Sequence, residues 1–364
     1  LHPHHSAAQT QELLQVWLQR LDLQQYVQVQ SNTVAGHGVW ALSLNNASFA
    51  AWTPDFDTLD IHTRLGLSSP HNTADLQREI AVAMLANPKV FVLPSAEELL
   101  AAVDVRSHIA QAAQKTALAF KTEAAERPDS HWHYDEEHGF LLRAGAELHE
   151  ALLLATQPQV SGRLYDFSCY RATEYVMLLG LAQALQTHNP PLRRALQEQC
   201  EVHAIRSAQF HDVFCIEYGS MQAPLPARYY VPGDRLWFRN PDERSADVTG
   251  FEGSWVMYMG GGLFSNFWRQ NKPFSMEAKC LEIYHWRHAW YADAQGQLHM
   301  DEALVEAQVA QTLCDPAQTR AIIDRMMRLR DPRGVYADGG CIDATREYPR
   351  WFSLAGGNLQ LPGA

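Results

Sequence analysis

The chain has 364 residues, 46% of them hydrophobic and 10% aromatic, which is enough to bury a large core in two domains or one elaborated domain. Its formal net charge is −12 and it has no basic block, which argues against a nucleic-acid partner. No apolar run approaches the ~20 residues of a membrane-spanning helix, and the first residues lack the layout of a signal peptide. We therefore expect no membrane partner either.

The six cysteines are widely scattered along the chain. They form neither the CxxC pairs of a zinc site nor the dense framework of a disulfide-rich secreted domain. This usage predicts reduced thiols and a cytoplasmic location. The cysteines are Cys169, Cys200, Cys215, Cys280, Cys314 and Cys341.

Residues 8–125 consist mainly of Gln- and Ala-rich stretches with helical periodicity, interrupted by one polar and aromatic segment. The sequence "ERPDS" at 126–130 combines charge, a proline and a residue that can cap a helix. We predict a mostly helical N-terminal region over 1–128, of unknown role, and a second domain over 129–364.

In the second region the sequence predicts a short strand in 138–145, a helix in 146–156, a long helix after Cys169 and another helix in 191–200. Aromatic and β-branched segments separated by turn residues then indicate an antiparallel meander. These strand-like segments are 235–240, 254–260, 262–268 and 280–291. A helical stretch over 301–329 and an aromatic tail over 341–352, expected to pack on the core, follow.

Cys169 stands at the start of the long predicted helix, with Ser168 or Asp166 in position to cap it. The unpaired N–H groups of a helix N-terminus favour a thiolate, which is the form of cysteine that attacks a carbonyl. Free cysteine is also among the residues most often buried in a core. The position alone therefore allows either a nucleophile or a structural residue.

Three motifs stand in order along the chain: "FSCYRATEYVMLLGLAQAL", "VPGDRLWFRNPD" and "GFEGSWVMYMGGGLF". Together with the upstream "HWHYDEEHGFLLRAG", they resemble the bacterial protein-glutamine γ-glutamyltransferases (transglutaminases) of spore-forming bacteria, over roughly residues 131–268. The resemblance implies an α+β fold with a papain-like core, in which the helix bearing Cys169 packs on an antiparallel sheet.

The resemblance also implies acyl transfer through Cys169 as the nucleophile. Its thiolate attacks the carboxamide of a protein glutamine, releases ammonia and leaves a thioester. A lysine amine then forms an isopeptide cross-link, or water completes a deamidation. The implied partners are proteins with accessible Gln and Lys side chains, and no metal or organic cofactor is implied.

The match places Ser254 where the family has a glutamate and Phe267 where it has a histidine. Glu252 is the expected substitute for the glutamate, since residues two apart in a strand share a face. His285 is the expected substitute for the histidine. His288, His203 and His211 are alternatives to it, with His285 and His288 on opposite faces of a regular strand.

Other motifs favour structural roles. "HWHYDEEH" indicates a polar hairpin rather than a metal site with mixed ligands. "MGGGLF" indicates a hairpin turn, and Asp234, Asn240 and Asp242 are expected to hold the turns around a strand. Alternative functions are a papain-like cysteine peptidase or amidase, a catalytically inactive protein-binding scaffold, and a secreted effector. The sequence does not indicate an oligomeric state.

Overall fold

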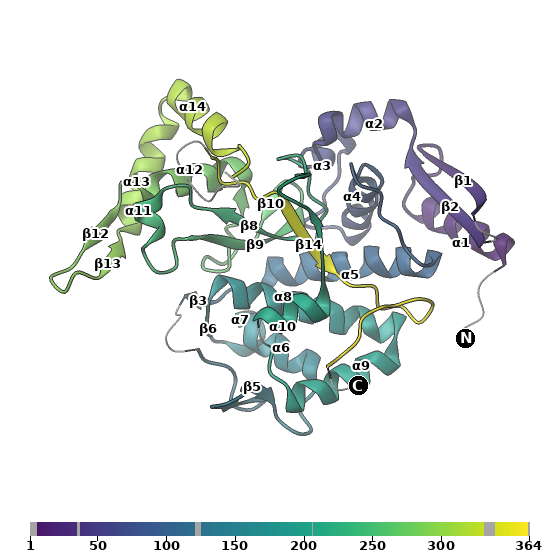
Figure 1. The fold of residues 1–364 in the computed structure, drawn as a ribbon, viewed down its shortest axis with the longest axis horizontal. Helices are drawn as coiled ribbons and strands as arrows, with labels where there is room; N and C mark the ends of the chain where they lie inside the picture. Colours follow the sequence, from purple (N-terminus) through teal and green to yellow (C-terminus); the bar gives the residue numbers. More distant parts are fainter. Residues whose placement is uncertain (1–5, 35–36, 121–124, 206, 331–338, 363–364) are drawn as a thin grey trace.

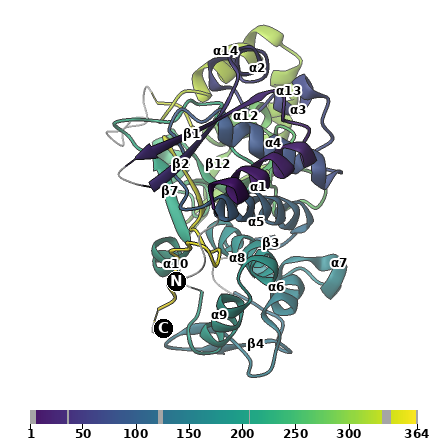
Figure 2. The same cartoon turned by 90° about the vertical axis from the view of Figure 1, so that its right-hand side faces the viewer.

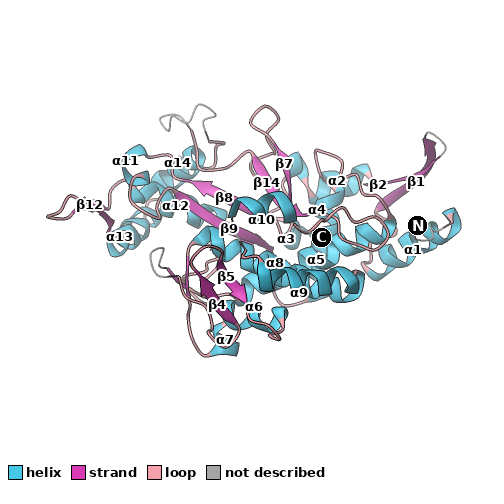
Figure 3. Cartoon of the chain, turned by 60° about the horizontal axis from the view of Figure 1, so that its bottom comes forward, coloured by secondary structure: helices cyan, strands magenta, loops and turns pink. Residues whose placement is uncertain are grey.

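The structure is a computed structural model that describes residues 6–34, 37–120, 125–205, 207–330 and 339–362. Figure 1 shows a central sheet with a layer of helices below it, the N-terminal elements on one side and a C-terminal helical lobe on the other. Helices and antiparallel strands are mixed along the chain, as the predicted α+β class requires (Figure 3). No helix among the described residues is long and apolar enough to cross a membrane.

The central sheet has six strands in the order β11-β10-β9-β8-β14-β7, and every paired neighbour is antiparallel. Strands β8, β9 and β10 lie in three of the four segments predicted to form the meander, and β11, which was not predicted, continues it. The aromatic tail supplies β14, which lies between β8 and β7 and is thus an internal strand rather than a surface segment. The strands are β7 (Cys215–Gly219), β8 (Arg235–Arg239), β9 (Gly253–Gly260), β10 (Leu263–Phe264), β11 (Phe274–Ser275) and β14 (Thr345–Pro349).

The strand prediction for 280–291 is wrong over most of its length. Helix α12 spans Met276–Trp286, and only the last residues enter a strand, β12 (Trp290–Ala292). Ser275 caps the helix by accepting from the Ala278 N–H, and its buried face follows a helical spacing. The aromatic residues of this segment had indicated a strand, but here they pack around a helix. The strand predicted over 262–268 is likewise limited to β10.

Helix α8 (Cys169–His188) is buried around nearly its whole circumference, as expected of a helix that is apolar on all sides. It packs closely on α5 (Ala96–Lys115): a Cβ atom placed on Gly180 would lie 2.7 Å from the Ile109 backbone nitrogen. Other helices cover the same core (Figure 2). They are α6 (Leu148–Thr156), α9 (Pro190–Val202) and α10 (Ser207–Phe214), whereas the short α7 (Pro158–Ser161) has no buried residue.

The N-terminal elements share cores with later parts of the chain. One hydrophobic cluster combines Trp17 and Ile80 with Tyr229 and Val231, which precede β8. In the hairpin β1–β2, only β2 lies within the polar and aromatic segment noted in the sequence, and β1 precedes it. The elements are α1 (Ala7–Arg20), β1 (Val27–Val34), β2 (His37–Leu44), α2 (Asn46–Trp52), η1 (Pro54–Phe56), α3 (Ile61–Leu65) and α4 (Thr73–Leu85).

The remaining elements form the C-terminal lobe and two small pairs of strands. A third hydrophobic cluster packs α12 and α14 on the face of β8 and β9 that carries Phe238 and Tyr258. The lobe elements are α11 (Glu243–Ala246), β13 (Leu298–Met300), α13 (Glu302–Leu313) and α14 (Pro316–Met326). The small pairs are β3 (Ala119–Phe120) with β6 (Asp166–Phe167), and β4 (Trp132–Asp135) with β5 (Gly139–Leu142).

The turns predicted around β8 are present. Asp234 accepts from the Val231 N–H, while the Asp234 N–H donates to the Val231 carbonyl. At the other end of β8, Asn240 and Asp242 accept from backbone N–H groups of the following turn. The hairpin turn expected in "MGGGLF" joins β9 to β10, where Gly261 has φ +63°. These turns fix β8 and β9 beside the Cys169 end of α8.

Candidate active site

Cys169 is the first residue of α8 and is half-buried. The short strand β6 leads into it, and Ser168 caps the helix by accepting from the Arg171 N–H at 3.3 Å. Of the two predicted caps, the structure uses Ser168. The sulfur therefore lies at the N-terminal end of a rigid, buried helix, as the sequence predicted.

The backbone N–H of Trp255 in β9 lies close enough to the Cys169 sulfur to lower the pKa of the thiol. The ladder of β8 and β9 explains why this N–H is available. The Asn240 N–H donates to Glu252 and the Tyr258 N–H donates to Asp234, so the even-numbered residues of β9 bond to β8. Ladder bonds recur at every second residue, so the Trp255 N–H points toward the opposite edge of β9.

Burial raises the pKa of the Cys169 thiol above its usual value, and the negative charge of Glu252 raises it further. The N–H groups of Trp255, Tyr170 and Cys169 itself act in the opposite direction. The helix N-terminus was expected to lower this pKa, but desolvation has the larger effect. The thiol is thus mostly protonated near neutral pH and needs a proton acceptor to react.

Aromatic side chains surround this end of α8. The Tyr170 ring meets the Trp255 ring edge-on with centroids 4.8 Å apart, and Trp255 stacks on Trp237 at 5.6 Å with an angle of 3° between the planes. The guanidinium of Arg235 lies 5.0 Å from the Tyr170 centroid and 5.4 Å from that of Trp255. These contacts hold the strand position whose N–H reaches the sulfur.

The structure places Glu252 close enough to Cys169 for its charge to affect the thiol. Its side chain is exposed, and one oxygen accepts from the Gly250 N–H at 3.4 Å. Ser254, which occupies the matched glutamate position, is half-buried in β9. Phe267, which occupies the matched histidine position, is a core residue, and its carbonyl accepts from the Leu118 N–H.

The structure does not bring His285 to this site. It lies on α12, where Nδ1 is 3.1 Å from the Gln308 Oε1 and Nε2 is 2.8 Å from the Thr312 Oγ1. Both ring nitrogens are thus engaged by α13, and burial lowers the pKa of the imidazole. Because α12 is a helix, His285 and His288 lie on neighbouring positions, with ring centroids 5.8 Å apart.

His211, one of the alternatives to His285, belongs to an ionic network that the sequence did not predict. Its Nδ1 lies 2.7 Å from the Glu347 Oε1, and the other Glu347 oxygen accepts from Arg235 Nε. The register of β14 places Glu347 opposite Arg235. The network therefore depends on the tail entering the sheet, for which no local pattern gave a signal. His203 ends α9 and is exposed.

The sequence "HWHYDEEH" forms the polar hairpin that was predicted. The strands β4 and β5 pair there, and Asp135 accepts from the backbone of Glu137 and His138 at the turn. The His138 Nδ1 lies 2.7 Å from Asp135 Oδ1. No group of three or more possible metal-binding side chains occurs within the described ranges.

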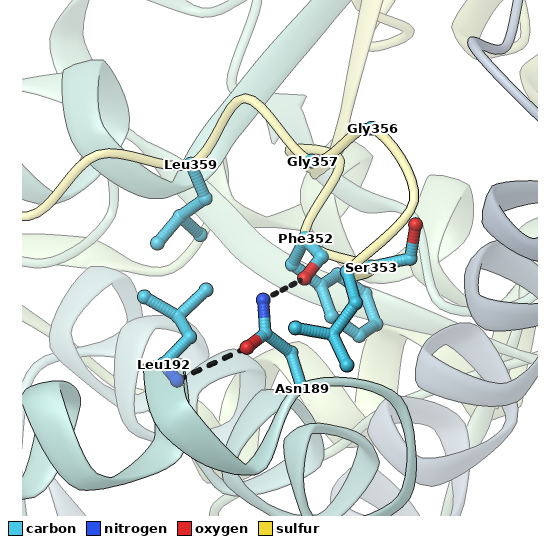
Figure 4. Close-up of a pocket in the computed structure, with 8 residues that line it drawn as sticks. Asn189, Leu192, Phe352, Ser353, Gly356, Gly357 and Leu359 are labelled. Atoms are coloured by element: carbon cyan, nitrogen blue, oxygen red, sulfur yellow. Dashed lines mark hydrogen bonds between the residues drawn. The ribbon is translucent and has the colours of Figure 1, made fainter. Parts of the chain in front are cut away.

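The pocket in Figure 4, with a volume of about 280 Å³, lies at the opposite end of α8. Asn189, which ends the helix, lines it and donates to the Phe352 carbonyl at 2.7 Å. Twenty helical residues span ~30 Å, so this pocket is not part of the Cys169 site.

Comparisons with known proteins place the chain in one family. The profile of the protein-glutamine gamma-glutamyltransferase family matches residues 59–347, which include the Cys169 site, α3 and α4 but not the elements that precede them. A solved transglutaminase from Geobacillus stearothermophilus, without its C-terminal extension, is 21% identical with a TM-score of 0.39, covering 58% of this chain and 96% of that one. A search of curated proteins found no match. Because the family profile spans well over half of its residues, the chain belongs to the protein-glutamine gamma-glutamyltransferase family.

Proposed function

We propose that the protein transfers the acyl group of a protein glutamine through a thioester on Cys169. The observation that carries this proposal is the position of the Cys169 sulfur, which lies beside the Trp255 N–H at the N-terminus of α8 and has Glu252 as its acidic neighbour. The packing of α8 on an antiparallel sheet supports a papain-like core for this chemistry.

Glu252 is the proposed proton acceptor. A thiol whose pKa is raised by burial must lose its proton as it attacks the carboxamide carbon. The acquired proton then goes to the leaving nitrogen, which departs as ammonia, and the carbonyl carbon is left bonded to sulfur. The Trp255 N–H is a donor for the negative oxygen that forms during the attack.

The thioester is resolved by a second nucleophile. A lysine amine gives an isopeptide bond and returns the thiol, whereas water gives glutamate. Both outcomes share the first half-reaction, so the protein is proposed to cross-link proteins and to deamidate glutamine when no amine is present. The proposed substrates are proteins with accessible Gln side chains, with Lys as the acceptor.

The predicted role of His285 as the substitute for the family's histidine has no supporting contact. Its hydrogen bonds to α13 leave neither ring nitrogen directed to another group. We propose the pair Cys169 and Glu252 as the reacting groups and do not assign the histidine a step.

The test uses a glutamine-containing peptide and a fluorescent primary amine, with ammonia release and amine incorporation measured in parallel. The wild-type chain should release ammonia and form an adduct on Cys169 that has the mass of the peptide less one ammonia. Cys169→Ala should do neither. Peptide-bond cleavage without ammonia release would instead identify a cysteine peptidase, and no reaction with any donor would favour an inactive scaffold.

A further inference from the structure

Two buried cysteines other than Cys169 lie in contact. The Cys280 and Cys341 sulfurs lie 3.5 Å apart, although the residues are 61 positions apart in the sequence. Neither side chain has any solvent exposure. Cys280 is on the inner face of α12, and Cys341 is in the segment that leads into β14 (Figure 1). The contact therefore connects the C-terminal lobe to the central sheet.

The backbone around both sulfurs is fixed by other contacts. The Cys341 N–H donates to the Met326 carbonyl at 2.8 Å, and the Cys341 carbonyl accepts from the Arg239 N–H at 2.8 Å. Gly340 can approach the Arg328 backbone only because it has no Cβ, since that atom would lie 2.0 Å from the Arg328 carbonyl oxygen. Cys280 packs in the same hydrophobic cluster as Met326. The two thiols are thus held facing each other.

The other cysteines in the described part of the chain do not face a second sulfur. Within the described part of the chain, Cys280 and Cys341 form the one cysteine pair whose sulfurs are in contact. Cys200 and Cys215 are buried in another cluster, and Cys314 is exposed with its thiol directed to the Ala310 carbonyl. The sulfurs of a disulfide are ~2.05 Å apart, so closing the pair requires a movement of about 1.5 Å.

We propose that Cys280 and Cys341 are a covalent modification site and form a disulfide when the chain folds in the presence of a low-molecular-weight disulfide. One thiolate attacks the small disulfide and releases one small thiol; the second protein thiolate then displaces the other. The protein loses two electrons and two protons to give one Sγ–Sγ bond, and the small disulfide is reduced to two thiols.

The surroundings of the Cys280 and Cys341 thiols predict the conditions under which this exchange occurs. The hydrogen bond with Cys341, together with burial, raises the pKa of the Cys280 thiol well above its usual value. Exchange proceeds through the thiolate, and the pair has no access to solvent. The folded, reduced protein should therefore oxidise slowly, whereas a chain that folds under oxidising conditions should close the bond as the two segments come together.

The bond would retain β14 in the sheet. It closes a loop that contains α13 and α14 and ends just before the strand that carries Glu347. Cross-linking a loop of this length restricts the unfolded chain. For a chain of this size, we expect a rise in the midpoint of thermal unfolding of about 3–6 °C.

The experiment refolds the full chain with a Cys169→Ser substitution, which removes the proposed nucleophile from the thiol count, in oxidised glutathione or in reductant. Five cysteines then remain of the six. The oxidised sample should lose two thiols that can be titrated in denaturant, yield a linked Cys280–Cys341 peptide, and unfold at the higher temperature. Cys280→Ser should abolish all three effects, and Cys314→Ser should abolish none.

An unchanged thiol count after oxidative refolding, or a linked peptide that involves another cysteine, would overturn the proposal. A linked pair without a thermal shift would overturn its stabilising role. None of these measurements uses transferase activity, so the result is independent of the proposed function.

Discussion

The backbone N–H of Trp255 in strand β9 lies next to the sulfur of Cys169, the first residue of α8, and acts on its thiol. The contact lowers the pKa of a thiol that burial raises. Because β9 bonds to β8 through its even-numbered residues, this N–H has no role in the ladder and is free for the sulfur. The position of one strand residue therefore adjusts the reactivity of the cysteine.

Trp237→Ala should reduce that reactivity. The substitution removes the stacked partner of the Trp255 ring, so the N–H should be held less firmly against the sulfur. We expect slower alkylation of Cys169 by iodoacetamide at a fixed pH, because the thiol pKa rises, and a kcat lower by roughly tenfold. Trp237→Phe keeps an aromatic face and should retain most of the alkylation rate of Cys169 and most of kcat. Equal alkylation profiles for the alanine variant and the wild type would contradict this role.

Glu252→Gln should change two properties of the site in opposite directions. Removing the negative charge lowers the pKa of Cys169, so alkylation at pH 8 should become faster. If Glu252 accepts the thiol proton, amine incorporation should fall by about 10²–10⁴-fold in kcat. A variant that is alkylated faster and also keeps its transferase activity would exclude the carboxylate from the reaction.

Glu243→Gln is the matched control for that experiment. Glu243 is exposed and lies in the first turn of α11, outside the groups that affect Cys169. Its substitution should change neither the alkylation profile nor the rate of amine incorporation.

The position of Cys169 at a helix start could be predicted from sequence because its determinants are local. A capping Ser168, helical periodicity and ordered motifs are all within reach of a sequence pattern, and the predicted helix begins at Cys169 in the structure. The strands β8 and β9 were predicted for the same reason. Glu252 was predicted from the strand that follows it, because residues two apart in a strand share a face and Glu252 is two positions before Ser254.

The tertiary parts of the site could not be predicted in the same way. The aromatic content of 280–291 indicated a strand, but α12 forms because its apolar face packs on the sheet. Glu347 reaches Arg235 only because the tail enters the sheet beside β8. The proposed domain boundary at 126–130 stays a prediction, and α5, which precedes it, shares a core with α8.

Gly180→Ala should test the crossing of α5 and α8. Alanine is favoured over glycine within a helix by ~1 kcal/mol, but its Cβ would lie 2.7 Å from the Ile109 nitrogen and 2.9 Å from its Cα. Backbone atoms cannot move aside cheaply, so the steric term should dominate and destabilise the protein by about 1–3 kcal/mol in denaturant unfolding. Gln183→Ala, at an exposed site on the same helix, should be nearly neutral.

Arg106→Met should be strongly destabilising. Arg106 of α5 donates to Asp234 at 2.6 Å, and both side chains are fully buried. Removing the guanidinium leaves a buried carboxylate that still accepts from Val231 and Tyr218 but has lost its counter-charge. We expect a loss of about 3–5 kcal/mol in the free energy of unfolding.

The double variant Arg106→Met, Asp234→Asn is the informative comparison for this pair. The amide oxygen still accepts from the turn, and no charge is left buried, so the double variant should be more stable than Arg106→Met alone. Strictly additive losses would show that the two charges do not interact.

Glu79→Gln should make the stability of the protein less dependent on pH. Glu79 of α4 is fully buried, and burial raises the pKa of its carboxyl despite hydrogen bonds from Gly261 and Tyr258. A raised native pKa means that the folded state retains a proton that the unfolded state has already released. The stabilising contribution is therefore complete below about pH 4.5 and is lost as the pH rises through the native value.

Glutamine cannot ionise, so the substitution should cost most at low pH, and its cost should shrink as the pH rises from 4.5 to 8. The measurement is the free energy of unfolding of both chains across that range. Glu12→Gln, at an exposed site on α1, should show a constant difference from the wild type. A Glu79 variant whose cost stays constant or grows with pH would mean that the carboxyl is ionised throughout, with the hydrogen bonds from Gly261 and Tyr258 outweighing the effect of burial.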